Sequence, residues 1–268
     1  MRPGTAIATA SLAALLALAA GPARAADTVF LDELTWTELR DAVKAGTTTV
    51  IVPAGGTEQS GPHLTLGKHN VRVRALAGRV ASELGHALVA PVIAYVPEGN
   101  VSPPTSHMRF PGTISVPAEI FEKTLEYAAR SLRQSGFRDI VLIGDHGGYQ
   151  ASLSAVERRL NREWAGTPVR VHAVLAYYRA QEDAYKRELE ARGYRAEEIG
   201  IHAGLADTSL ALAVDPRIVR TDRLGDPPRA ADGTYGDPRR AKAELGELGV
   251  NAIVRETVEA IRRAERRR

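Results

Sequence analysis

Four short apolar runs recur along the chain, and a segment with apolar residues at helical spacing lies between successive runs. The runs are TTTVIVPAGG, ALVAPVIAYV, RDIVLIGDHGG and VRVHAVLAYY. Apolar runs bounded by turn residues are typical of strands that are buried on both faces of a sheet. Because strands that alternate with helices form parallel sheets covered by helices, the sequence predicts an α/β fold with three α/β/α layers around a mostly parallel central sheet.

The segments between these runs are predicted to be helices: NVRVRALAGRVASELG, PAEIFEKTLEYAARSLRQSG and YQASLSAVERRLNREWAG. Pro117 suits the first turn of the second helix, and Gly85 and Gly136 stand where the first two helices should stop. The stretch VPEGNVSPPTSHMRFPGTISVP is long and irregular. Long loops inside a compact domain are usually functional or disordered, and we expect this one to form an ordered wall of a pocket.

The first 25 residues have the features of a secretory signal peptide. Arg2 precedes an Ala/Leu run, and Ala-Arg-Ala at 23–25 is a small-x-small cleavage site. A membrane anchor is the alternative, but the run is short and ends in Gly-Pro, and no later apolar run approaches the roughly 20 residues of a spanning helix. We therefore expect cleavage near Ala25/Ala26, a single domain over residues 26–268, a periplasmic or secreted protein, and no stable membrane anchor.

Cysteine usage and charge exclude several classes of function. The chain has no cysteine, which rules out disulfides, a cysteine nucleophile and thiolate metal sites. The formal net charge of +3 includes Arg2 and Arg24 of the predicted signal peptide, so the mature chain is close to neutral. The C-terminal RRAERRR ends a helical pattern, where cations are favourable and solvated, and we expect no nucleic-acid partner.

Ionisable side chains gather in loops that follow the predicted strands or precede helices. They are Glu58, His63, His69, His107, Asp145, His146, His202 and Asp207. In open α/β sheets, ligands bind outside the carboxyl ends of the strands. Imidazole nitrogens and carboxylate oxygens are suitable ligands for zinc or manganese, and such an ion lowers the pKa of a bound water and polarises a carbonyl. The pattern therefore indicates hydrolytic chemistry.

Each of these residues also has a purely structural interpretation. Glu58 could be a carboxylate at the start of a helix, and His69 could cap the helix that it precedes. His63 could hold its loop by hydrogen bonds, and Asp145 could bond loop amides. Asp207, which precedes Thr-Ser at a helix start, could be an N-cap. The coincidence of all of them at strand ends is what favours a site.

Two other classes of site lack their motif. Ser60 lies in EQSGP and not in the G-x-S-x-G turn of a serine hydrolase. The stretch AGGTEQSG lacks the Lys-Ser/Thr of a phosphate-binding loop, and Glu58 would repel an anion there.

Five blocks of the sequence resemble the creatininase (creatinine amidohydrolase) family, in the same order. GGTEQSGPHLTLGKHN is similar to the family's E-Q-H-G-P-H-L-P-L stretch, and the later blocks are RFPGTISV, IGDHGGYQ, HAGLADTSLALAVDP and YGDPRRAKAELG. The resemblance covers roughly residues 50–246. It implies one creatininase-like α/β domain, a two-metal zinc or manganese site, hydrolysis of a cyclic amide or related C–N bond, and a homo-oligomer.

The resemblance also implies roles for individual residues. The family's first glutamate ligand falls on Glu58, and a histidine ligand falls on His146. The histidine credited with proton transfer falls on His202. The acidic residue five positions later is Asp207, a shorter carboxylate than the family's usual glutamate.

At other positions the chain departs from the family. Ser60 stands in place of a histidine ligand, His69 in place of the bridging aspartate, Gly148 in place of an acidic ligand, and Tyr149 in place of an asparagine. A carboxylate can bridge two cations, whereas a neutral imidazole offers one lone pair to one metal. These departures predict a metal site of Glu58, His69 and His146 with Asp207, holding one or two ions.

Four further residues are expected beside the ligands or the substrate. They are His63, His107, Asp145 and Tyr149, and Asp145 could orient a ligand imidazole.

Two functional hypotheses follow. The first is an exported metal-dependent amidohydrolase that splits a C–N bond of a small amide, cyclic or open, through a metal-activated water, with His202 and Asp207 as catalytic residues. The second is a catalytically degenerate relative that binds a small ligand or another chain without turnover, which the changes at Ser60, His69 and Tyr149 suggest.

Overall fold

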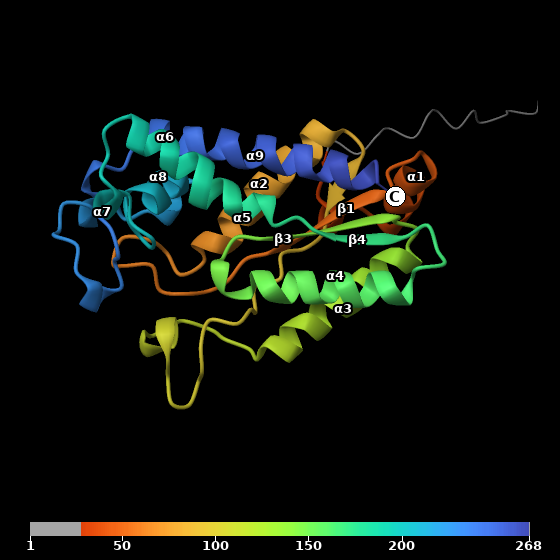
Figure 1. The fold of residues 1–268 in the computed structure, drawn as a ribbon, viewed down its shortest axis with the longest axis horizontal. Coiled ribbons are helices and arrows are strands. Elements are labelled where there is room, and N and C mark those ends of the chain that lie inside the picture. The colour runs from red at the N-terminus through yellow and green to blue at the C-terminus, as the bar shows by residue number, and fades with distance from the viewer. Residues whose placement is uncertain (1–27, 268) are drawn as a thin grey trace, which may run out of the picture.

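A computed structural model describes residues 28–267 and shows four parallel strands in one sheet (Figure 1). The strands are β1 (Thr49–Ala54), β2 (Ala87–Val89), β3 (Asp139–Gly144) and β4 (Arg170–Ala173), in the order β2-β1-β3-β4. In the central pair, Thr49 is aligned with Asp139 and Ala54 with Gly144, so β1 and β3 end side by side. The predicted parallel sheet is confirmed.

Helices cover both faces of this sheet and form the two outer layers (Figure 1). One face packs against α2 (Lys68–Leu84) and α9 (Ala243–Glu265), and α3 (Ala118–Gln134) and α4 (Gln150–Glu163) pack on the other. Side chains of successive strand residues point to opposite faces, so Ile51 joins the first core and its neighbours Val50 and Val52 join the second. The predicted three-layer architecture is confirmed.

Shorter helices complete the chain. The α-helices are α1 (Trp36–Lys44), α5 (Ala176–Ala180), α6 (Lys186–Ala191), α7 (Ala196–Ile199) and α8 (Leu205–Val214), with a π-helical turn over Gln181–Tyr185. The 3-10 turns are Leu31–Glu33, Ser106–Arg109, Gly147–Tyr149, Pro216–Ile218, Thr221–Arg223, Ala230–Asp232 and Pro238–Arg240. Among residues 28–267, no helix has both the length and the apolar character needed to cross a membrane.

The second predicted strand is shorter than its apolar run. β2 ends at Val89, and Pro91 has no backbone N–H to continue the ladder. The chain returns to the sheet edge at Ile93, whose N–H donates to the Pro53 carbonyl at 2.9 Å. The remainder of the run therefore leaves the sheet and leads into the long loop.

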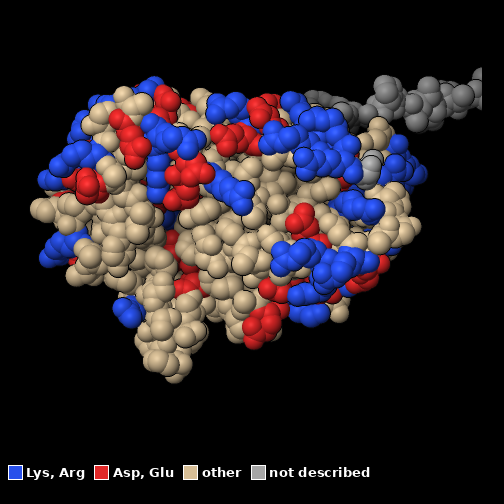
Figure 2. Space-filling model, in the orientation of Figure 1, with Lys and Arg blue, Asp and Glu red and all other residues tan. Residues whose placement is uncertain are grey.

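The predicted long loop, residues 96–117, projects from the body of the molecule (Figure 1). In the space-filling view it forms a lobe whose tip has no charged side chains (Figure 2), in agreement with the sequence GNVSPPTS at residues 99–106. Its inner part returns to the ends of β1 and β3, where it adds side chains to the site. The predicted signal peptide and its cleavage site lie outside the described residues.

Candidate metal centre

A polar pocket of about 660 Å³ opens beside the carboxyl ends of β1 and β3. Its lining includes Gln59, Lys68, His69, His107, Arg109, Asp145, His146, Tyr178, Ile201, His202 and Asp207. These residues come from segments far apart in the sequence. The expectation that loops at the strand ends would meet therefore holds for most of the predicted site.

Glu58, which follows β1, is the centre of this site and is fully buried. Its Oε1 lies 2.7 Å from His69 Nε2. Its Oε2 lies 3.2 Å from His107 Nε2 and 3.6 Å from His146 Nε2, but neither contact has hydrogen-bond geometry, so Oε2 has no hydrogen-bond partner among residues 28–267. Burial would raise the pKa of Glu58, but the interactions with His69, Lys68 and His146 together outweigh burial and hold it well below its usual value.

Glu98 is a site residue that sequence reasoning missed. It lies in the long loop, its side chain is fully buried, and neither of its carboxyl oxygens has a hydrogen-bond donor among the described residues. Burial, together with the nearby charge of Glu58, raises the pKa of Glu98 to about 10. The signal in the sequence was a lone acid between Pro97 and Gly99, in a loop that was expected to wall a pocket.

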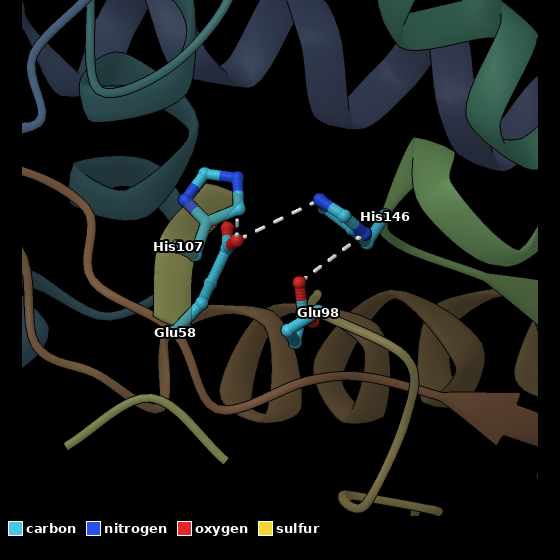
Figure 3. Close-up of side chains that lie close together, drawn as sticks. All are labelled: Glu58, Glu98, His107 and His146. Atoms are coloured by element: carbon cyan, nitrogen blue, oxygen red, sulfur yellow. Dashed lines mark ion pairs between the residues drawn. The ribbon is translucent and has the colours of Figure 1, made fainter. Parts of the chain in front are cut away.

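Four of these side chains could hold a metal ion together (Figure 3). Each of Glu58, Glu98, His107 and His146 offers one ligand atom, and the four atoms lie within 4.8 Å of one another. Burial lowers the pKa of His107 and lowers that of His146 to about 4, so both rings are neutral. Nδ1 of His146 accepts from the Gly148 N–H at 3.2 Å, and Nδ1 of His107 lies 3.0 Å from the Gln59 side-chain nitrogen. The Nε2 atoms, which face Glu58, must therefore give up their protons for these rings to bind a metal through them.

The residues of this group fit a divalent cation. Three buried carboxylate oxygens of Glu58 and Glu98 lack hydrogen bonds within the described residues, although buried polar atoms normally have partners. Two carboxylates side by side repel each other unless one keeps its proton or a cation lies between them. Two imidazole nitrogens and two carboxylates are a common ligand set for zinc or manganese.

His69 was a predicted ligand, but the structure holds it between two carboxylates. Its Nε2 faces Glu58, and its Nδ1 lies 2.6 Å from Asp145 Oδ2. Arg72 Nη2 also lies 3.2 Å from His69 Nδ1, so both ring nitrogens are already engaged by side chains of the protein. The observed contacts indicate that His69 orients Glu58, a role different from the predicted direct ligation.

Asp207, the other predicted ligand outside the group of four, is also fully engaged. One carboxylate oxygen bonds Lys68 Nζ and the Ala203 N–H, and the other accepts from Arg72 Nη1 at 2.6 Å. Asp207 lies inside α8, whose N-cap is Gly204, so it is not the N-cap that the structural interpretation required. Its side-chain partners are cations of the protein. Neither carboxylate oxygen is therefore free for the predicted roles of metal ligand and catalytic residue.

Asp145 connects these ion pairs behind the pocket. Its Oδ2 accepts from Arg72 Nε at 2.8 Å and from His69, and its Oδ1 accepts from Tyr177 at 2.7 Å. Asp145 therefore orients the His69 ring, which is related to the predicted orienting role. Sequence reasoning missed Lys68, Arg72 and Tyr177. The signal for the first two was a helix start, GKHNVR, with cations and no acid in its first turn.

His202 faces Glu58 from the opposite wall. Its Nε2 donates to the Gln59 carbonyl at 2.9 Å, so the neutral ring keeps its proton there. Its Nδ1, which then carries the lone pair, lies 3.7 Å from Glu58 Oε1. Burial and the charge of Lys68 lower the pKa of His202 to about 3. The Gln59 side chain also lies 3.0 Å from His107 Nδ1, so Gln59 contacts two of the site histidines.

The remaining predicted residues lie behind the site. His63 is buried with Nε2 2.9 Å from Thr208 Oγ1, which agrees with its loop-holding interpretation. The Tyr149 hydroxyl accepts from the Asp145 and His146 N–H groups, both at 3.1 Å, and donates to the Gly55 carbonyl at 2.6 Å. Tyr149 therefore ties the ends of β1 and β3 together.

Comparison with known proteins places this fold and site in a family. The sequence profile of the creatininase family, described as creatinine amidohydrolase, matches residues 32–261. Creatinine amidohydrolase of Pseudomonas putida is 32% identical over 257 residues, which cover 87% of this chain and 96% of that protein. The mycofactocin precursor peptide peptidase of Mycolicibacterium smegmatis is 29% identical over 240 residues, or 80% and 84% of the two chains.

Solved structures agree with the sequence comparison. A crystal structure of creatininase superposes with a TM-score of 0.75 at 30% identity and covers 89% of this chain and 98% of its own. A manganese form has a TM-score of 0.71 at 31% identity, and a variant named as a Zn-Zn type has 0.70 at 30%; each covers 88% of this chain and 98% of its own. The predicted class of enzyme, a metal-dependent amidohydrolase, is confirmed. The chain belongs to the creatininase (creatinine amidohydrolase) family, as a divergent member.

Proposed function

We propose that this chain is an exported amidohydrolase that uses one divalent cation, zinc or manganese, to hydrolyse a C–N bond of a small amide. The observation that carries the proposal is the buried pair of Glu58 and Glu98, which converges with His107 and His146 and in which three of the four carboxylate oxygens lack hydrogen bonds among the described residues. A buried pair of carboxylates without donors is stable only with a proton or a cation between them.

One ion per chain accounts for the charges better than two. The carboxylates outside the group of four, Asp145 and Asp207, are already paired with Arg72 and Lys68. His69 also contacts both Glu58 and Asp145, at 2.7 and 2.6 Å. These protein cations neutralise the charge that a second metal would otherwise neutralise, so we expect one ion held by Glu58, Glu98, His107 and His146.

The residues around the ion have distinct roles in hydrolysis. When bound, a divalent cation supplies Lewis acidity, which polarises a carbonyl and makes water a better nucleophile. His202 presents its unprotonated Nδ1 towards Glu58, and its role in the proposal is to carry a proton from the attacking water to the leaving nitrogen. Its pKa of about 3 means that the ring holds this proton only transiently and gives it up readily. The Gln59 carbonyl holds the proton of His202 on Nε2 and thereby fixes the ring for this task.

The proposal also includes a small-molecule substrate, a periplasmic or secreted location and a homo-oligomer. The pocket volume of about 660 Å³ fits a small ligand. The names of the two curated relatives describe a creatinine amidohydrolase and a peptide peptidase, and both reactions split an amide C–N bond. The N-terminal sequence supports a periplasmic or secreted location, and the family resemblance supports a homo-oligomer, which light scattering would test.

A ligand-binding protein without turnover is the second candidate. Both ring nitrogens of His69 and both carboxylate oxygens of Asp207 already contact other side chains, so these two predicted site residues are not free to bind a metal or substrate. This observation favours the second candidate.

Hydrolysis assays separate the two candidates. The mature protein, loaded with zinc or manganese, is incubated with cyclic and open-chain amides such as creatinine, 5-oxoproline and N-acetylglycine, and loss of the amide is measured. We expect hydrolysis that chelation abolishes. His202→Ala should keep the metal and lose about 10²- to 10⁴-fold in rate, because it removes the proton carrier. Full turnover by His202→Ala, or turnover that survives removal of the metal, would contradict the mechanism.

A further inference from the structure

Lys68 is a buried ammonium group that lines the pocket and that no step above uses. Its side chain is 1% exposed, and its Nζ lies 3.9 Å from Glu58 Oε1, too far for a hydrogen bond. An ammonium group has three N–H donors, and among the described residues Lys68 makes one hydrogen bond, to Asp207. Donor capacity therefore remains beside the proposed reaction site.

The position of Lys68 is unfavourable for the helix that carries it. Lys68 is the first residue of α2, and the N-terminus of a helix is positive, so a cation there is destabilising. Burial of a charge adds to this cost. Positions that violate local rules of stability in this way are often functional.

Support of Asp207 does not by itself require Lys68. Asp207 also accepts hydrogen bonds from Arg72 Nη1 at 2.6 Å and from the Ala203 N–H at 3.0 Å. It would keep these two partners without Lys68. Asp207 therefore fixes the position of the Lys68 ammonium group, whereas Asp207 has other partners that hold it in place.

We propose that Lys68 is a catalytic residue that donates a hydrogen bond to the oxyanion formed during amide hydrolysis. The inference rests on the proposed function. Water forms a C–O bond to the carbonyl carbon, the π electron pair moves onto the carbonyl oxygen, and His202 takes one proton of the water. Collapse reforms the C=O bond and breaks the C–N bond, and the proton passes from His202 to the departing nitrogen, which gives a carboxylic acid and an amine. Lys68 stabilises the negative oxygen between these two events.

Binding of methylphosphonate tests this role without a known substrate. Methylphosphonate is a tetrahedral anion, like the intermediate, and its dissociation constant is measured by calorimetry on the metal-loaded mature protein. We expect Lys68→Met to weaken binding by about 10-fold or more, because one donor to the anion is lost, with metal content unchanged. Lys186→Met is the matched control, since it removes a lysine that pairs with the pocket residue Glu182, at 2.7 Å.

The outcomes separate this inference from the proposed function. Binding within about twofold of the wild type in Lys68→Met, or an equal loss in Lys186→Met, overturns the role of Lys68 and leaves the metal site intact. Loss of metal from Lys68→Met also overturns it, because Lys68 would then support the metal site. If the wild type takes up no metal, the proposed function fails and this inference fails with it. Should Lys68→Met not fold, Lys68→Met/Asp207→Asn removes both charges of the pair and must show the same weakened binding.

Discussion

At the scale of single residues, the site depends on where buried charges find partners. Glu58 has His69 on one oxygen, Asp145 has Arg72, and Asp207 has Lys68 and Arg72. Glu98 Oε2 lies 3.6 Å from Nδ1 of the neutral His146 ring, but neither oxygen of Glu98 has a hydrogen bond among the described residues. Its pKa of about 10 means that it keeps its proton at neutral pH in the absence of a cation. Glu98 is thus the residue whose state should change most when a metal binds.

Metal binding should release a proton from Glu98. The carboxyl group is protonated below its raised pKa and must lose that proton to act as a ligand, so affinity should increase as the pH rises from neutral towards about 10. Calorimetric titration with zinc in buffers of different ionisation enthalpy measures the protons released. Glu98→Gln binds zinc more weakly and is brought to saturation with excess zinc; we then expect the wild type to release about one proton more than the variant at pH 7. An equal number from the two proteins would show that Glu98 is not a ligand.

In the metal-free protein, the Glu98→Gln substitution should increase stability. In the unfolded chain Glu98 ionises near pH 4.5, whereas in the folded protein it stays protonated to about pH 10, so its contribution to stability falls as the pH rises between these values. Glu98→Gln removes this titration. At pH 8 the metal-free variant should therefore unfold at a higher temperature than the metal-free wild type. A lower unfolding temperature would contradict the raised pKa.

At the scale of elements, the ends of β1 and β3 carry most of the site, and Tyr149 ties them together. Its hydroxyl contacts the Gly55 carbonyl after β1 and the N–H groups of Asp145 and His146 after β3. Glu58 and His146 follow these same two ends, so the tyrosine helps to set the distance between two of the proposed ligands.

Tyr149→Phe should therefore destabilise the protein. The substitution keeps the ring but leaves two buried N–H groups and a carbonyl without this partner, a loss of about 1–3 kcal/mol in the free energy of unfolding. Thermal unfolding measures the change. Tyr127→Phe is the matched control, because Tyr127 lies on α3 with 65% of its surface exposed and should change stability little. Equal unfolding temperatures for Tyr149→Phe and the wild type would contradict the tie between the strand ends.

The sequence predicted the strands and helices well because their signals are local. Apolar runs bounded by turn residues identified β1 and β3, and Gly85, which has a φ of 78°, ends α2 as predicted. The group of four was predicted only in part, with Glu58 and His146 as ligands and His107 nearby. Glu98 escaped notice because its loop returns to the site only after β2 ends early, at Val89. The partners of Asp207 depend on α2 and α8 lying side by side, and those of His69 on α2 lying beside the ends of β1 and β3, which no local pattern encodes.

At the scale of the whole molecule, the surface has mixed charge on the side seen in Figure 2. Basic and acidic side chains alternate there over α9 and α4. That pattern is compatible with a protein that acts on a small molecule, and the absence of a nucleic-acid partner stays a prediction.

Export also belongs to this scale. We expect the protein recovered from the periplasm or medium of an expressing bacterium to begin at Ala26, because Ala23-Arg24-Ala25 precedes that residue. Intact-mass spectrometry of the recovered protein measures the cleavage position. An uncleaved chain that stays with the membrane fraction would support the anchor alternative.

The central claim is that one divalent ion binds Glu58, Glu98, His107 and His146. The most direct test is elemental analysis of mature protein purified without chelator and then equilibrated with zinc or manganese, compared with Glu98→Gln and Asp207→Asn variants whose folding is checked by circular dichroism. The account predicts about one equivalent of metal in the wild type and in Asp207→Asn, and a large loss in Glu98→Gln. Metal retained by Glu98→Gln but lost from Asp207→Asn, or no metal in the wild type, would contradict it.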